Sequence, residues 1–304
     1  MSKYSKIYFI GIGGIGMSAI ARYYKFKGYP VAGYDRTPSD LTHALEKEGI
    51  DIHYKDDPDY IPKDVASTLV VYTPAIPADL QELVYVREHG YTLVKRSRML
   101  GELAEGQTCL AVAGTHGKTT TSTLVAHILT ESGKGCSAFL GGISKNYDTN
   151  LLTSHTPTIV AEADEFDRSF LQLHPAIAAI TAMDADHLDI YGTLEEYRKA
   201  FKAFASQVSR TLIVKLGLDI TAEDTNARIL HYSYDNPDAD YHAANPRPDE
   251  VGHYISDLVY PGGVIGNIRV GIPGWDNVEN SVAAAAVCRF HGVATDAVKD
   301  AIVT

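Results

Sequence analysis

The stretch TCLAVAGTHGKTTTSTLVAHILT, residues 108–130, decides the fold class of this chain. An apolar segment, Thr108–Ala113, enters a glycine-rich turn, and Lys118–Thr130 then has the composition of a helix. A strand, a glycine loop and a helix in this order predict a phosphate-binding unit, because glycines let backbone amides approach phosphates and Lys118 adds positive charge. The loop departs from the strict Walker pattern, because Val112 stands five positions before Gly117. We expect phosphates, with the β- and γ-phosphates at Lys118, to be held by Gly114, Thr115, His116, Gly117, Lys118, Thr119 and Thr120.

A second glycine motif, GIGGIG at Gly11–Gly16, stands between a predicted strand, Ile7–Ile10, and a predicted helix that ends near Lys27. Its G-x-G-x-x-G spacing is typical of a turn that binds a pyrophosphate at a helix N-terminus. Asp35, nineteen residues after Gly16, ends the next predicted strand. The motif indicates a pyrophosphate without saying which one. A NAD-dependent dehydrogenase and a turn without a ligand therefore stay open at this point.

Predicted strands and helices alternate along the chain, which indicates an α/β protein with parallel sheets and crossover helices. With 304 residues, the chain is long enough for two domains. The alternation pauses at Gly106-Gln107, so we expect a Rossmann-like domain at residues 1–106 and a P-loop-type ATP-binding domain at residues 107–304.

The first domain has further predicted strands at Val31–Asp35, Thr68–Thr73 and Thr92–Val94 and helices at Asp40–Glu48 and Asp79–Glu88. The second has predicted strands at Thr158–Ala161, Ala176–Thr181 and Thr211–Val214, a helix at Thr193–Phe204, a hairpin of Tyr254–Tyr260 and Ile265–Gly271, and helices at Asn277–Phe290 and from Thr295. Residues 217–252 are polar and stay unassigned.

Acidic residues follow two of the predicted strands in the second domain. The first group is EADE at Glu162–Glu165, and the second, DADHLD at Asp184–Asp189, contains His187. Ligands gather at the carboxyl ends of parallel strands, so Glu162 and His187 are candidate Mg²⁺ ligands beside the Thr119 hydroxyl. The alternatives are an acidic turn or helix start at Glu162 and a solvated acidic loop at His187.

Two asparagines, Asn277 and Asn280, are spaced to face one way on the first turn of a predicted helix. An amide side chain carries a donor and an acceptor, as recognition of an adenine edge requires. Helix capping by Asp276 or Asn277 is the alternative, and the spacing alone favours it.

The composition excludes several classes of protein. A net charge of −11 disfavours a general nucleic-acid binder. Three widely separated cysteines, which we expect in or near the core, indicate a reducing compartment. No stretch predicts insertion into a membrane. The apolar run Ile7 to Ala21 also fits a signal peptide, but four glycines in the six positions of Gly11–Gly16 disfavour the helix that a signal peptide needs.

These motifs, in this order, resemble the Mur ligase family over essentially the whole chain. The resemblance is most specific at Gly11–Ser18 (GIGGIGMS), Gly114–Thr120 (GTHGKTT), Glu162–Phe170 (EADEFDRSF) and Asp186–Tyr191 (DHLDIY). It implies a cytoplasmic, ATP- and Mg²⁺-dependent ligase of peptidoglycan synthesis. It is closest to the branch that joins L-alanine to UDP-N-acetylmuramate through an acyl phosphate.

The resemblance also implies roles for individual residues. The glycine turn, with Gly11, Gly13, Gly14, Ile15 and Gly16, would bind the pyrophosphate of the UDP-sugar, with Asp35, Thr73, Pro74 and Ala75 at the uridine end. Lys118 and Thr119 would hold the ATP phosphates and one Mg²⁺, and Glu162 and His187 a second Mg²⁺. Catalysis would therefore rest on Lys118, Glu162 and His187. Asn277 and Asn280 would contact adenine.

The sequence departs from the family pattern in four places. Relatives often have histidine where this chain has Asp276, and asparagine where it has Ala182. Other Mur ligases carry a carbamylated lysine at the position of Phe201, next to Lys202 here, which disfavours a carbamate. Family members also have a third, C-terminal domain, which would begin near Thr304. We interpret the chain as a fragment and expect it to be inactive alone.

Two further functions stay open. A tripeptide-recycling ligase shares much of the N-terminal pattern. A nucleotide-binding protein without catalysis would explain both glycine loops but not Glu162 and His187.

Overall fold

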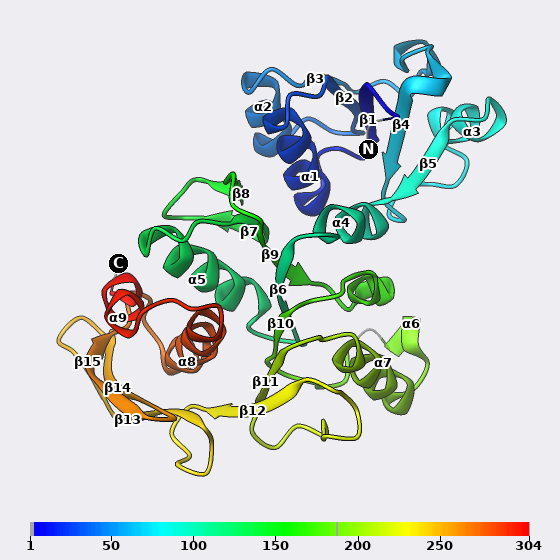
Figure 1. Ribbon diagram of the computed structural model, residues 1–304. Helices are drawn as coiled ribbons and strands as arrows, with labels where there is room; N and C mark the ends of the chain where they lie inside the picture. Colours follow the sequence, from blue (N-terminus) through cyan, green and yellow to red (C-terminus); the bar gives the residue numbers. More distant parts are fainter. Residues whose placement is uncertain (1–2, 187, 304) are drawn as a thin grey trace. The chain divides into compact units, whose positions relative to one another are not determined.

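The computed structural model describes residues 3–186 and 188–303, and the chain divides into two compact units. The first unit comprises Met1–Leu103 with Phe139–Thr153, and the second comprises Ala104–Ala138 with Ser154–Thr304. Each unit is built on a sheet whose strands alternate with helices along the chain (Figure 1). The predicted α/β class is confirmed.

The first unit has a five-stranded parallel sheet in the order β3-β2-β1-β4-β5. The strands are β1 (Lys6–Ile10), β2 (Val31–Tyr34), β3 (Asp51–His53), β4 (Thr68–Tyr72) and β5 (Thr92–Lys95). The helices are α1 (Ile15–Phe26), α2 (Asp40–Lys47), α3 (Gln81–Glu88) and α4 (Arg96–Ala104), with short 3₁₀ helices at Pro58–Tyr60 and Val65–Ser67. Residues 7–10 of the central strand β1 are all buried, which explains the continuous apolar run. The strand order reverses between β1 and β4, and ligands bind at such a point in open α/β sheets.

A hairpin from later in the chain completes the first unit. It consists of β7 (Ser137–Ser144) and β8 (Thr149–Leu152), and β8 packs against α1. Asn150 is fully buried, and its Nδ2 donates to the Ile15 carbonyl (2.6 Å) and the Ser18 hydroxyl (2.8 Å). Its Oδ1 accepts a hydrogen bond from the buried Arg22 guanidinium. The sequence did not indicate this hairpin, and the functional boundary at residues 106 and 107 stays a prediction.

The strands that belong to the second unit follow one another in the order β15-β14-β13-β12-β11-β10-β6-β9, in a sheet of mixed direction. Its strands are β6 (Thr108–Ala113), β9 (Thr158–Ala163), β10 (Ile177–Ile180), β11 (Thr211–Lys215), β12 (Arg228–Ser233), β13 (Tyr241–Pro248), β14 (Tyr254–Tyr260) and β15 (Gly263–Arg269). Its helices are α5 (Lys118–Glu131), α6 (Leu188–Tyr191), α7 (Leu194–Ser206), α8 (Trp275–Phe290) and α9 (Thr295–Ile302), with a 3₁₀ helix at Phe166–Gln172. Pairing is parallel from β9 through β13 and antiparallel from β13 to β15. The predicted hairpin is thus β14 and β15, and the unassigned residues 217–252 contain β12 and β13.

Helix α8 lies against α5 and the sheet in the second unit (Figure 1). All residues from Ser281 to Cys288 are buried. Such a helix has no polar face, and its alanines let it approach its neighbours closely. All three cysteines, Cys109, Cys136 and Cys288, are buried and unpaired, so their predicted place in the core is confirmed.

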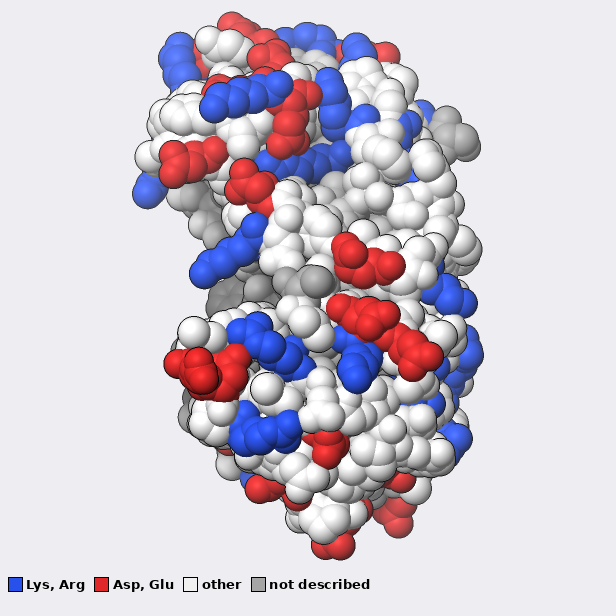
Figure 2. Space-filling model, turned by 90° about the vertical axis from the view of Figure 1, so that its left-hand side faces the viewer, with Lys and Arg blue, Asp and Glu red and all other residues white. Residues whose placement is uncertain are grey.

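The surface is mixed in charge. On the face drawn in Figure 2, basic and acidic side chains are interspersed over each unit, so the residues described on this face form no continuous basic strip. Within the described ranges, no helix is both long and apolar enough to span a lipid bilayer.

Candidate functional site

The phosphate loop, residues 114–117, joins β6 to α5 in the second unit. Gly114 and Gly117 have φ angles of +135° and +80°, a region that disfavours residues with a Cβ atom. A side chain at position 117 would also begin 2.6 Å from Asn280 Oδ1, and one at position 114 would overlap Thr181. Glycine is therefore required at both positions on grounds of backbone conformation and space.

The strand order brings three carboxyl ends together around this loop. β6 lies between β10 and β9, with Ala113 paired to Ile180 and Val112 paired to Glu162. The Thr115 amide donates to the Ala182 carbonyl at 3.2 Å, which ties the loop to the residues after β10. The structure therefore places Glu162 at the same sheet edge as the loop. Glu162 belongs to β9, which extends to Ala163, and not to a turn or a helix start.

Lys118, the first residue of α5, has its ammonium at the loop. Its Nζ donates to the Gly114 carbonyl at 2.7 Å and to Glu165 Oε1 at 3.0 Å. Glu165 Oε2 lies 2.9 Å from the same ammonium but accepts no hydrogen bond from any described residue. The Glu165 side chain is only 1% exposed, and its backbone carbonyl accepts from the Tyr191 hydroxyl at 2.6 Å.

A second contact fixes the start of the loop to α7. The Thr115 hydroxyl lies 3.0 Å from the Asp184 carbonyl and 2.9 Å from the Tyr197 hydroxyl. Burial raises the pKa of Tyr197 to about 12, against the lowering effect of its hydrogen bond with Thr115. Tyr197 is therefore neutral at physiological pH and acts here as a hydrogen-bonding anchor.

The first turn of α8 lies against the loop. The Thr121 hydroxyl donates to Asn280 Oδ1 at 3.2 Å, and Asn280 Nδ2 lies 3.4 Å from Asn277 Oδ1. The two asparagine side chains are therefore neighbours on one side of the first turn, as their spacing predicts. The favoured alternative, capping by Asp276 or Asn277, is wrong, because the helix begins at Trp275 with Gly274 as its N-cap. The glycine takes this position because its φ is +105°.

The structure describes two of the three candidate Mg²⁺ ligands. Thr119 is exposed at the start of α5, and Glu162 is half-buried at the sheet edge. His187 lies outside the described residues. Within residues 3–186 and 188–303, no three or more His, Cys, Asp or Glu side chains are arranged to hold a metal ion.

The first unit presents its own glycine turn between β1 and α1. Gly11 has a φ of +86°, and the Gly13 amide donates to Asp35 Oδ2 at 2.7 Å. Thr73, after β4, lies so close that a Cβ on Gly11 would begin 3.0 Å from its methyl group. Pro74 and Ala75 follow it and are exposed. The structure thus brings Asp35 and Thr73 to the predicted pyrophosphate turn.

Arg96 at the start of α4 is a further cation at this turn, and the sequence did not single it out. A side chain at position 16 would begin 2.5 Å from Arg96 Nη1, so the guanidinium lies directly over Gly16. A positive group beside a helix N-terminus, here the start of α1, favours an anionic ligand.

A buried polar cluster lies deeper in the first unit. The Tyr8 hydroxyl lies 2.6 Å from Glu82 Oε2 and 2.7 Å from His53 Nε2. His53 Nε2 is 3.3 Å from Glu82 Oε1, and His53 Nδ1 is 2.8 Å from the Lys55 carbonyl. Burial raises the pKa of the Glu82 carboxyl to about 7, although the hydrogen bond from Tyr8 lowers it. Burial also lowers the pKa of His53.

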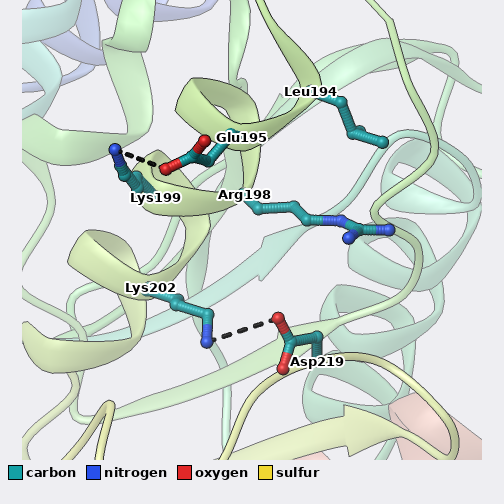
Figure 3. A pocket seen from close by; sticks show the side chains of 6 residues that line it. All are labelled: Leu194, Glu195, Arg198, Lys199, Lys202 and Asp219. Atoms are coloured by element: carbon teal, nitrogen blue, oxygen red, sulfur yellow. Dashed lines mark ion pairs between the residues drawn. The ribbon is translucent and has the colours of Figure 1, made fainter.

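The outer face of α7 lines a shallow pocket of about 490 Å³ (Figure 3). Its lysines are already paired, Lys199 with Glu195 at 2.9 Å and Lys202 with Asp219 at 3.4 Å. On the inner face, Phe201 is fully buried and its ring packs edge-on against Phe170 at 5.1 Å. Position 201, which the family resemblance matches to a carbamylated lysine, is therefore part of the core here. The pocket lining is Leu194, Glu195, Arg198, Lys199, Lys202 and Asp219.

Two family models match this chain. The Mur ligase middle domain matches residues 112–288, and the Mur ligase family catalytic domain matches residues 6–108. Among curated proteins, the UDP-N-acetylmuramate–L-alanine ligase of Porphyromonas gingivalis is 49% identical over 304 residues, which cover 98% of this chain and 66% of the relative. The enzyme of the same name from Phocaeicola vulgatus is 50% identical over 299 residues, covering 96% and 65%. The chain thus spans just under two thirds of the length of these relatives.

Solved structures show the same architecture. The UDP-N-acetylmuramate–alanine ligase of Thermotoga maritima superposes with a TM-score of 0.86 at 28% identity, over 98% of this chain and 67% of that one. A murein peptide ligase of Psychrobacter arcticus superposes with a TM-score of 0.82 at 22% identity, over 99% and 68%, a likeness of fold alone.

Proposed function

The chain belongs to the Mur ligase family, and from that premise we propose that it serves the ATP-dependent joining of L-alanine to UDP-N-acetylmuramate (UDP-MurNAc) in peptidoglycan synthesis. The relatives that are 49% and 50% identical carry that name, which supports L-alanine over other amino acids. The tripeptide-recycling alternative rests on a likeness of fold at 22% identity.

The reaction needs an activated carboxylate. An oxygen of the UDP-MurNAc carboxylate attacks the γ-phosphorus of ATP, and ADP leaves with the electrons of the broken P–O bond. The nitrogen of L-alanine then attacks the acyl carbon, phosphate leaves, and the amine loses a proton. Negative charge develops on the phosphoryl oxygens in the first step, so positioned positive charge lowers the barrier.

The residues of the second unit suit this first step. The amides of the phosphate loop and the Lys118 ammonium would bind the β- and γ-phosphates of ATP, because both lie at the N-terminus of α5. The neighbouring amides of Asn277 and Asn280 would contact adenine at the adjoining helix turn. In the first unit, the glycine turn with Arg96 and Asp35 would hold the UDP moiety.

Magnesium fits the oxygen donors at the sheet edge. Thr119 and Glu162 are the hard ligands that Mg²⁺ prefers, and His187 would complete the set. When bound, Mg²⁺ would supply positive charge to the phosphoryl oxygens.

A single observation carries the proposal, namely that each unit places a glycine turn at the carboxyl ends of parallel strands, with a lysine in the second. A NAD-dependent dehydrogenase would leave the loop at residues 114–117 without a role. A binding protein without catalysis would leave Glu162 without one.

Calorimetry on the chain with UDP-MurNAc, NAD⁺ and ATP tests the proposal. We expect binding of UDP-MurNAc and ATP, and Lys118→Ala should weaken ATP binding while leaving UDP-MurNAc binding unchanged. Binding of NAD⁺ without UDP-MurNAc would overturn the proposal.

A further inference from the structure

We propose that Glu165 is the positioning residue of Lys118: its buried carboxylate holds and neutralises the ammonium at the phosphate loop before nucleotide binds, and thereby lowers the affinity for nucleotide. This inference rests on the proposed function, because it concerns the same ATP site.

The geometry gives Lys118 a defined place. An ammonium has three hydrogens to donate. The Gly114 carbonyl takes one at 2.7 Å and Glu165 Oε1 takes another at 3.0 Å. The third remains for a phosphate oxygen. Lys118 is thus fixed between the loop and the residues after β9, so it need not be ordered by the nucleotide.

Glu165 is itself held firmly. The hydroxyl of Tyr191, a buried residue, donates to its carbonyl at 2.6 Å. The next residues along the chain turn sharply, with Asp167 and Arg168 at φ angles of +51° and +55°. Phe170 then enters the core, where its ring stacks on Phe204 at 5.1 Å. The backbone that carries the Glu165 carboxylate is therefore fixed by a packed segment.

The charge of Glu165 opposes the incoming ligand. A carboxylate with 1% of its side chain exposed is poorly screened by water, and it lies next to the group that must attract phosphates. The ion pair with Glu165 neutralises part of the Lys118 charge, so Lys118 attracts phosphate less strongly. Removing the negative charge while keeping an oxygen acceptor should therefore tighten nucleotide binding, an effect that a purely structural residue would not produce.

The test measures the affinity for the non-hydrolysable analogue AMP-PNP with Mg²⁺ by calorimetry. Glu165→Gln keeps the shape and the acceptor, and we expect about tenfold tighter binding. Glu165→Asp restores the charge and should return the affinity to within about threefold of the original. Glu195→Gln makes the same change in net charge on the exposed face of α7 (Figure 3) and should leave the affinity unchanged. UDP-MurNAc affinity should be equal in all variants.

A double-variant cycle shows whether Glu165 acts through Lys118. In the Lys118→Met background, Glu165→Gln should no longer tighten binding, and it should raise the melting temperature by relieving an unpaired buried carboxylate. Equal tightening with and without Lys118, or no tightening at all, would overturn the inference and leave the proposed function standing. If Lys118→Met binds AMP-PNP as well as the unaltered chain does, the ATP site at the loop is wrong and the inference falls with it.

Discussion

Replacing the buried Glu82 by glutamine should change how the stability of the first unit depends on pH. Glu82 is fully buried on α3, and burial raises its carboxyl pKa from 4.5 to about 7. Between about pH 4.5 and pH 7, the folded state therefore holds a proton on Glu82 that the unfolded state has released. The stability that the protonated Glu82 contributes is fully present below about pH 4.5 and is lost as pH rises through about 7.

The size of the effect follows from the two pKa values. The rise of the Glu82 pKa from 4.5 to about 7 corresponds to about 3 kcal/mol in the free energy of unfolding, because a change of one in pKa is worth about 1.36 kcal/mol. His53 acts in the opposite direction, because its pKa is lowered and its contribution is lost as pH falls. Comparing the variant with the unaltered chain at each pH measures the share of Glu82 together with the change that its replacement causes at His53.

Glutamine suits this site because it resembles the protonated acid. His53 Nδ1 faces the Lys55 carbonyl and must donate to it, so the neutral ring has Nε2 as an acceptor. The glutamine oxygen would still accept from Tyr8, and the neutral amide would bring no charge into the buried site. Glu82→Gln should therefore gain about 3 kcal/mol relative to the unaltered chain between pH 4 and pH 8.

Urea unfolding followed by circular dichroism at each pH gives the free energies of unfolding. Fluorescence of Trp275, the one tryptophan, follows the second unit and separates its transition from that of the first. Glu88→Gln is the control, because Glu88 is exposed on the same helix and its replacement makes the same change in net charge. Parallel pH profiles for Glu82→Gln and the unaltered chain would refute the reasoning.

Three other substitutions have expected outcomes. Gly117→Ala combines a φ of +80° with a Cβ placed 2.6 Å from Asn280 Oδ1, so ATP affinity should fall at least tenfold by calorimetry while UDP-MurNAc affinity is unchanged. Arg96→Met should weaken UDP binding about tenfold and leave ATP binding alone, because it removes the cation over Gly16. Phe201→Ala removes a fully buried ring and should destabilise the second unit by about 3–5 kcal/mol in urea unfolding.

The strand–turn–helix segments were predictable because glycine turns stand between apolar runs in both units. β12 was missed, although Leu230 and Tyr232 alternate with half-buried neighbours, because the surrounding residues are rich in turn formers. β13 contains Asn245 and Pro248, which are poor strand formers, and it is held by pairing with β14. Local sequence could not indicate such a tertiary effect.

The candidate site was predictable in part. The loop, Glu162 and the asparagine pair follow from short motifs, and the strand order brings them together. Glu165 was visible only as one acid among several, since its pairing with Lys118 depends on how the chain turns after β9. Arg96 gave no signal, because an arginine after a strand is common and only the fold puts it over Gly16.

The first unit is built from two separate segments of the chain, and this has a consequence for its biosynthesis. Its residues up to Leu103 leave the ribosome first, but the Asn150 side chain that pairs with Arg22 follows only with Phe139–Thr153. At about 5–20 residues per second, the fifty residues from 104 to 153 take about 3–10 s to translate. During that interval Arg22 lacks its amide partner and α1 lacks the strand that covers it. The nascent first unit therefore waits, with an incomplete surface, for a segment encoded inside the second.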